Sequence, residues 1–229
     1  AENIGLRTYK DGGFSAESYG VRAIGEVNNG VVSSTYGYVV DLALRLNTQN
    51  LKTDGATTSA VDGKLLLQTD GIQRIYSVSE NADTLGGGSY MSFTANGLEA
   101  EAVKKLMGAI RVTFVQDYGK LSSAPRILGT AKLDVSANLA TDENGEYKAN
   151  LYLYSADGTK LDQDKAVLLD AMKKNAACQI SAIVWLDGRS VTNAEVAASE
   201  AMSLSGKLNL QFSTDVKLNP AANAPLKGE

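Results

Sequence analysis

Apolar and polar residues alternate along most of this chain with a period of two. The clearest case begins at Tyr38, after which every second residue is apolar: Val40, Leu42, Leu44 and Leu46. Because successive side chains of a strand point to opposite faces, this pattern predicts a strand with one buried face. Similar runs predict about ten strands, over residues 21–27, 38–47, 65–68, 72–78, 90–95, 110–117, 126–135, 148–154, 178–186 and 204–212.

Turn signals separate these runs. Asn29-Gly30, Asp157-Gly158 and Asp187-Gly188 are dipeptides that favour tight turns, because Gly and Asn adopt a positive φ at low cost. Short strands separated by such turns are typical of sandwiches, barrels and jelly rolls. The expected fold class is mainly β, an antiparallel jelly-roll or β-sandwich with two or three short peripheral helices.

A helical period occurs in three places. One run follows the i, i+3, i+4, i+7 spacing of an amphipathic helix, which would lead into the strand at residue 110: Val103, Leu106, Met107 and Ile110. A second helix is expected over residues 164–175, with a stripe of Leu168, Ala171 and Met172. A third is expected to start at Thr192, which begins a capping-box pattern.

The two ends of the chain differ from its body. Residues 1–14 form an extended segment punctuated by Gly, in which Ile4, Leu6 and Thr8 share one face. Residues 15–218 are expected to form a single β-sandwich domain, because all-β sandwiches of this length are commonly one domain. Residues 219–229 are interpreted as a polar C-terminal tail.

Composition narrows the classes of function. The chain has no histidine and a single cysteine, which removes histidine general bases, Ser-His or Cys-His nucleophiles and histidine-ligated zinc. A net charge of −4 with scattered Lys and Arg argues against nucleic acid as a partner. Apolar runs are far shorter than the roughly 20 residues of a membrane-spanning helix. We therefore expect no enzyme, no cofactor, no metal site and no transmembrane segment, and interpret Cys178 as a small buried residue.

The loops add little chemistry. Gly86-Gly87-Gly88 precedes a strand-like run, whereas phosphate cradles precede a helix. Residues 142–146 lie between two predicted strands and are interpreted as a hairpin turn. Residues 157–164 have some acidic positions of a calcium loop but lack its oxygen spacing and final Glu. A solvated turn is favoured there, and weak calcium binding is the alternative.

Tyr152 and Tyr154 form a possible ligand face. In the strand predicted at residues 148–154 they alternate with Leu151 and Leu153 and so lie on the opposite face. Exposed aromatic rings on a sheet can stack on sugars or contact a protein. The alternative is that a second layer of the fold covers them.

Several segments together resemble a known family. They are YVVDLALRLN at residues 38–47, LLLQTD at 65–70, QRIYS at 73–77, AIRVTF at 109–114, ISAIVWLDG at 180–188, VTNAEVA at 191–197 and SGKLNLQFS at 205–213. From about residue 38 onward, the chain is similar to secreted proteins of gut Firmicutes that depend on a SipW-type signal peptidase, in the TasA and camelysin-like biofilm-fibre group. A chain that starts at Ala1 is compatible with cleavage of a signal peptide.

The resemblance implies a jelly-roll fold, an extracellular or cell-surface location, and polymerisation into pilus or biofilm-matrix fibres. It also implies donor-strand complementation, in which an N-terminal segment of one subunit fills a gap in the sheet of the next. The partner is then another copy of the chain, joined head to tail. Residues 1–14 become the candidate donor strand, with self-assembly residues Ile4, Leu6, Thr8 and Tyr9.

One other reading remains. A monomeric cell-surface adhesin or carbohydrate-binding module is the alternative, and its partners would be host or matrix glycans or proteins. Camelysin-like members are often described as metalloproteases, but a chain without histidine gives that label no zinc-ligand support.

Overall fold

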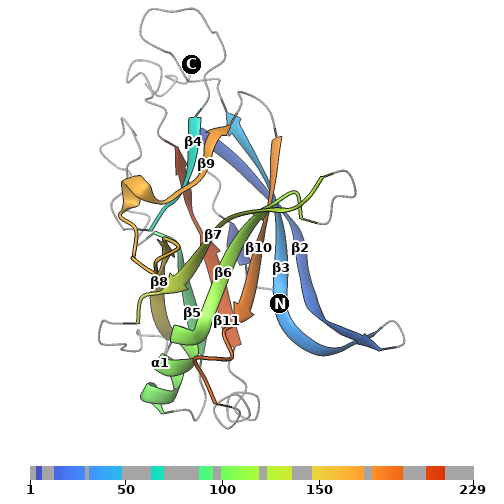
Figure 1. The fold of residues 1–229 in the computed structure, drawn as a ribbon, viewed down its shortest axis with the longest axis vertical. Helices are drawn as coiled ribbons and strands as arrows, with labels where there is room; N and C mark the ends of the chain where they lie inside the picture. Colours follow the sequence, from blue (N-terminus) through green and yellow to red (C-terminus); the bar gives the residue numbers. More distant parts are fainter. Residues whose placement is uncertain are drawn as a thin grey trace, which may run out of the picture.

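The computed structural model describes the chain over residues 4–6, 13–28, 31–47, 63–69, 88–94, 99–118, 123–135, 146–172, 177–192 and 205–214. This part is mainly β, as predicted (Figure 1). The predicted strand at 72–78, most of the predicted third helix, and the tail at 219–229 lie outside the described residues.

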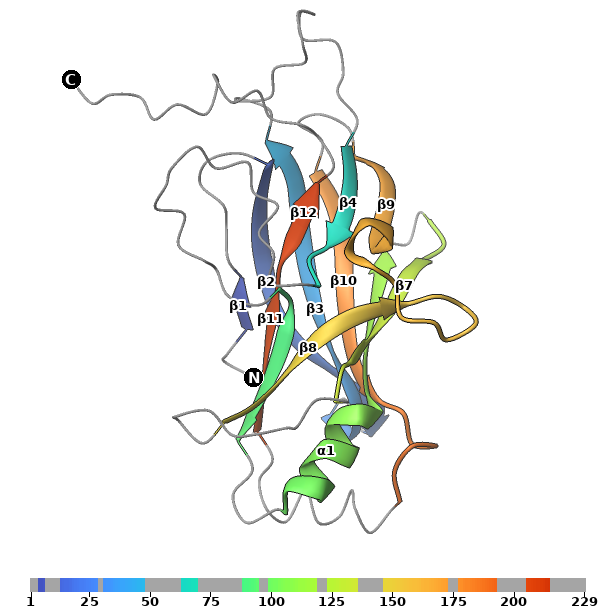
Figure 2. The ribbon, with the colours of Figure 1, turned by 90° about the vertical axis from the view of Figure 1, so that its left-hand side faces the viewer.

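Nine strands form one curled sheet. In spatial order they are β1 (Ile4–Leu6), β11 (Ser205–Leu210), β5 (Tyr90–Thr94), β8 (Glu146–Tyr154), β7 (Arg126–Leu133), β6 (Ile110–Gln116), β10 (Ala177–Leu186), β3 (Val31–Asn47) and β2 (Gly13–Asn28). All neighbours are antiparallel except β1 and β11, which are parallel. The sheet curls into a half-barrel (Figure 2), and its two edge strands, β1 and β2, contact each other.

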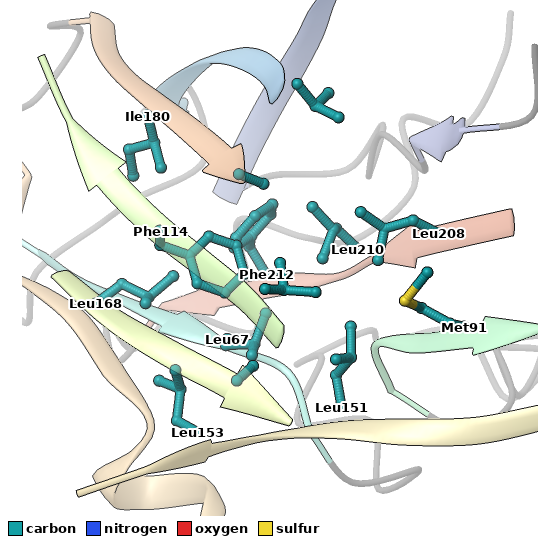
Figure 3. Close-up of a cluster of buried hydrophobic side chains, with 14 of the residues drawn as sticks. Leu67, Met91, Phe114, Leu151, Leu153, Leu168, Ile180, Leu208, Leu210 and Phe212 are labelled. Atoms are coloured by element: carbon teal, nitrogen blue, oxygen red, sulfur yellow. The ribbon is translucent and has the colours of Figure 1, made fainter. Parts of the chain in front are cut away.

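A second sheet has three strands, in the order β12 (Phe212–Thr214), β4 (Gly63–Leu67) and β9 (Val167–Met172). A short 3-10 helix, η1 (Gln163–Lys165), precedes β9. Side chains of both sheets share one core, in which Leu67, Leu168 and Phe212 lie close to Phe114 and Ile180 (Figure 3). The rings of Phe114 and Phe212 meet edge to face, with centroids 6.2 Å apart.

Period-two burial is confirmed over residues 40–44 of β3. Val40, Leu42 and Leu44 of β3 are buried, while Asp41 between them is only half-buried. The predicted hairpin after residue 28 is consistent with the register, since Asn28 pairs with Val31. One face of β3 therefore supplies the core, as the alternation predicted.

The amphipathic helix is confirmed as α1 (Ala100–Ala109). Its apolar side chains Val103, Leu106 and Met107 are buried, and the helix runs directly into β6 at Ile110. It lies at one end of the curled sheet, as Figure 2 shows. The helix thus covers a sheet end, which is the role expected of it.

The helix predicted over 164–175 is wrong. Residues 163–165 form η1 and Val167–Met172 form β9, which hydrogen-bonds to β4. Leu168 and Leu169 are both buried, whereas Ala171 of the expected apolar stripe is exposed. Pairing with a distant strand decides the conformation here, because periodicity in so short an apolar run does not distinguish helix from strand.

The single strand predicted at 204–212 is divided at Gln211. β11 ends at Leu210 in the large sheet and β12 starts at Phe212 in the small one, so the chain crosses between sheets at Gln211. Alternation placed Gln211 on the polar face, but only 3% of it is exposed. The buried backbone N–H and carbonyl of this residue require hydrogen-bonding partners.

Ser89 and Gln68 supply those partners. The backbone N–H of Gln211 donates to Ser89 Oγ at 2.9 Å, and Ser89 Oγ donates back to the Gln211 carbonyl at 3.1 Å. The same carbonyl accepts from the N–H of Gln68 at 2.9 Å. Nearby, Gln163 Oε1 accepts from the hydroxyl of Thr69 at 3.0 Å, and Gln163 Nε2 donates to the Leu67 carbonyl at 2.9 Å.

Replacing Ser89 by alanine tests this junction. Ser89→Ala leaves the buried N–H of Gln211 without its acceptor, so we expect a loss of about 1–3 kcal/mol in the free energy of unfolding. Urea unfolding followed by tryptophan fluorescence measures it. Ser123→Ala removes an exposed hydroxyl and is the control, expected to change stability by less than about 0.5 kcal/mol. Equal stability of both variants would show that the junction is not a source of stability.

Candidate functional site

The outer face of β8 presents Tyr152 and Tyr154, as the sequence predicted. Leu151 and Leu153 between them are buried, and both tyrosines are half-buried. The ammonium groups of two lysines contact their rings. Alternation along a single strand does not predict this arrangement.

Three lysine side chains stack on three tyrosine rings. The ammonium of Lys148 lies 4.0 Å from the ring centroid of Tyr90. Lys160 lies 4.4 Å from the ring of Tyr152, and Lys132 lies 4.6 Å from the ring of Tyr154. All three distances are within the range of cation–π attraction. We call these six residues the lysine–tyrosine face.

Strand register explains why these residues meet. Lys132 of β7 pairs with Tyr152 of β8, so the ring on which it stacks, Tyr154, is its diagonal neighbour. Lys148 of β8 pairs with Ser92 of β5, and its ring partner Tyr90 is again diagonal. Diagonal neighbours on one face are within reach of long side chains.

Lys160 reaches the face from the turn that follows β8. The chain reverses at Asp157 and Gly158, and residue 160 then bridges back to Tyr154. Lys160 Nζ also donates to Asp134 Oδ2 at 2.9 Å. This hydrogen bond raises the pKa of Lys160. Burial, followed by the negative charge of Asp134, raises the pKa of the Tyr154 hydroxyl.

A hydrogen-bonded row continues across β10, β6 and β7. Trp185 Nε1 donates to Thr113 Oγ1 at 2.9 Å, and the hydroxyls of Thr113 and Thr130 are 3.1 Å apart. Thr130 in turn pairs with Tyr154 in the sheet register. Trp185 is half-buried and lies on the face of β10 opposite the buried Ala182. Polar and aromatic groups thus cover several strands of the outer face.

Arg111 of β6 links the turn after β10 to the end of α1. Arg111 Nη2 contacts Asp187 Oδ2 at 3.2 Å, and Arg111 Nη1 donates to the Gly108 carbonyl at 2.7 Å. Arg189 Nε donates to the other oxygen of Asp187, also at 3.2 Å. The hydrogen bond from Arg189, aided by the charge of Arg111, lowers the pKa of Asp187. The Asp187-Gly188 turn is therefore tied to the end of α1.

Chemically, the lysine–tyrosine face presents ammonium groups, not bare aromatic rings. Each tyrosine ring has a lysine on one side, so a sugar would meet cations there. Sequence reasoning identified Tyr152 and Tyr154 but missed Lys132, Lys160 and Tyr90. Alternation alone would place Lys132 outward on its strand; its partner depends on register.

The acidic segment after Tyr154 forms a self-contained turn. The Asp157 carboxylate accepts from the Ser155 hydroxyl and from the Thr159 N–H, and these bonds lower the pKa of Asp157. Within the described ranges, no group of three or more Cys, Asp or Glu side chains could hold a metal ion. Cys178, interpreted as buried, is half-buried against the core, and Gln116 Nε2 lies 3.8 Å from its sulfur.

Two of the four predicted self-assembly residues, Ile4 and Leu6, lie at a sheet edge. Ile4 is in register with Leu208, and Leu6 with Leu210, in the parallel β1–β11 pair. Thr8 and Tyr9 lie outside the described residues. In the sheet order, β11 and β5 separate this edge from β8. The structure therefore does not join the self-assembly residues and Tyr152 and Tyr154 into one site.

Comparisons with protein-family models, with curated proteins and with solved structures give no match. Of the helices that the structure describes, none is long and apolar enough to span a membrane. The fold and the two candidate sites define a mainly β protein with an N-terminal edge strand and a cationic, tyrosine-rich outer face.

Removing the Asp187 carboxylate tests the link between the turn after β10 and the end of α1. Because the folded state lowers the pKa of Asp187, its stabilising effect is present at neutral pH and is lost as pH falls through the lowered value, below the usual 3.8. Asp187→Asn should therefore unfold at lower urea than the native chain near neutral pH, and the difference should vanish in strong acid. Asp170→Asn, at an exposed position of β9, is the control. A difference that persists unchanged in strong acid would contradict the assignment.

Proposed function

We propose that this chain is a secreted structural subunit that polymerises by donor-strand complementation into extracellular or cell-surface filaments, of the pilus or biofilm-matrix kind. The observation that carries the proposal is the position of β1. It is a three-residue parallel strand at the edge of the sheet, beside β11 and in contact with the opposite edge strand β2. The resemblance to the TasA and camelysin-like group supports the same assignment.

The edge of β11 is suited to an added strand. Without β1, one side of β11 would present unpaired backbone N–H and C=O groups, which an added strand satisfies. The N-terminal segment of the same copy and that of a neighbour can form equivalent ladders. Leu208 and Leu210, in register with Ile4 and Leu6, are buried at this edge. The alternating apolar residues of the donor segment suit such positions.

The N-terminal segment of the same copy competes with that of a neighbouring copy for the β11 edge, and this competition governs assembly. A tethered segment acts at an effective concentration on the order of millimolar, which favours the intramolecular donor in dilute solution. We therefore expect polymers only above a threshold protein concentration. Exchange of the segment between copies is a head-to-tail contact that does not close, so it generates a filament and not a ring of fixed size.

We also propose that the fold is a jelly roll. A curled sheet and a three-stranded sheet that share one core are compatible with a two-sheet jelly roll, which the resemblance also implies. Secretion and the lack of enzymatic activity are proposed on the same resemblance and on the absence of histidine.

A monomeric adhesin or carbohydrate-binding module is the second candidate. The lysine–tyrosine face favours it, because hydrogen-bonding and cationic side chains cover several neighbouring strands there. An adhesin would remain a monomer at concentrations at which a filament subunit polymerises.

Deleting residues 1–9 distinguishes the two. We expect the full chain to form regular fibres in negative-stain electron microscopy once its concentration approaches the effective concentration of its own tethered segment, and the deletion variant to form none while remaining folded. A synthetic peptide of residues 1–14 should bind the deletion variant and raise its melting temperature, because it refills the β11 edge.

Point variants refine this test. Ile4→Asp with Leu6→Asp should abolish fibres, because it places charges beside the buried Leu208 and Leu210. Lys10→Asp changes the charge of the segment outside β1 and should leave fibres intact. Fibres from the Ile4 and Leu6 double variant would show that the donor assignment is wrong. Single particles from the full chain at every concentration would favour the adhesin.

A further inference from the structure

We propose that the lysine–tyrosine face binds a linear polysaccharide that carries carboxylate groups. The inference concerns the face on which the second candidate function rests, and it names the class of ligand. It does not depend on polymerisation, because β1 lies at a separate edge of the sheet.

Among the described residues, no carboxylate pairs with two of the cations of the face, Lys132 and Lys148. Lys160 is paired with Asp134, and Lys207 of the neighbouring β11 with Glu146. In the described part of the chain, the only electrostatic contacts of Lys132 and Lys148 are their cation–π contacts with tyrosine rings. The face thus retains uncompensated positive charge in a chain whose net charge is −4. An anionic ligand is the complement of such a surface.

The tyrosine rings hold these ammonium groups in place. A lysine side chain free in solvent loses rotamer freedom when it binds an anion, which weakens binding. Attraction to the faces of Tyr154 and Tyr90 restricts Lys132 and Lys148 beforehand. Their N–H groups on the side away from the ring remain able to donate to a carboxylate. The stacking therefore prepares the two cations for an ionic contact.

Spacing favours a polymer over a small anion. Lys132 pairs with Tyr152, and Lys148 lies four residues before Tyr152 on β8. At about 3.4 Å per residue along the strand, the two Cα atoms are about 14 Å apart. While the two ammonium groups stay on the rings of Tyr154 and Tyr90, one carboxylate does not contact both, whereas a chain with repeated carboxylates does.

Uncharged hydrogen-bonding groups lie between the cations. Asn150 is half-buried on β8 between Lys148 and Tyr152, on the same face as both. Amide groups and the tyrosine hydroxyls suit the hydroxyls of sugars. Single-stranded nucleic acid needs aromatic faces on which bases stack, and here lysines occupy one side of each ring. The face therefore fits an acidic polysaccharide better than nucleic acid.

Binding to polygalacturonate tests the proposal. The full chain, kept below the concentration at which it forms fibres, is passed over immobilised polygalacturonate at low salt, with dextran and single-stranded DNA as comparison surfaces. We expect binding to polygalacturonate, none to dextran, and weaker binding to DNA. The affinity should fall with added salt, because ionic contacts are screened.

A matched pair of variants locates the site. Lys132→Gln with Lys148→Gln should weaken binding to polygalacturonate about tenfold. Lys104→Gln with Lys105→Gln makes the same change of charge on α1 and should change the affinity by less than about twofold. Both variants are at surface positions, and circular dichroism verifies that they fold.

Three results would overturn the proposal. They are no binding to polygalacturonate at low salt, equal binding to dextran or DNA, and equal losses in the two lysine double variants. None of them bears on filament formation, which the N-terminal variants test separately. Loss of fibres in those variants with retained polygalacturonate binding would show that the two functions are independent.

Discussion

Reciprocal hydrogen bonds between Ser89 and Gln211 stabilise the point where the chain crosses from one sheet to the other. A chain that leaves one sheet for another exposes backbone donors and acceptors at the crossing, and burial makes each unpaired group costly. Ser89 satisfies the N–H and the carbonyl of Gln211 with a single hydroxyl. Its own carbonyl accepts from Leu151 of β8, and the next residue, Tyr90, belongs to the lysine–tyrosine face. The outer face therefore depends on a junction in the interior.

Much of the fold could be predicted from local pattern, and the failures have a common cause. Alternation fixes the faces of residues 38–47 and 148–154, because a strand that is buried on one side must keep its register. It fails over 164–175 and at Gln211, where partners far away in sequence decide the conformation. Residues 167–172 form a strand because they pair with β4, and Gln211 is buried because Ser89 accepts a hydrogen bond from its backbone N–H. The pairing of β1 with β11 is also nonlocal, and a three-residue strand carries little pattern.

The candidate site could be predicted only in part, because it too depends on partners that are distant in sequence. Period two placed Tyr152 and Tyr154 outward, which the structure confirms. Their partners Lys132 and Lys160 follow from the β7–β8 register and from the turn at Gly158, neither of which alternation encodes. Tyr90 joins through a third strand. The sequence shows which residues are lysines and tyrosines, but it does not show which lysine stacks on which tyrosine ring.

The path of β11 has a mechanical consequence. β11 runs alongside β1 and continues through Gln211 into β12, so one stretch of backbone belongs to both sheets. A pull along β1 loads the β1–β11 ladder in shear, and bonds loaded in shear resist together, whereas peeling breaks them one at a time. The load then passes along a continuous strand into neighbours on either side of the core. Beyond the three-residue ladder, tension applied at the N-terminal edge is thus shared between the two sheets.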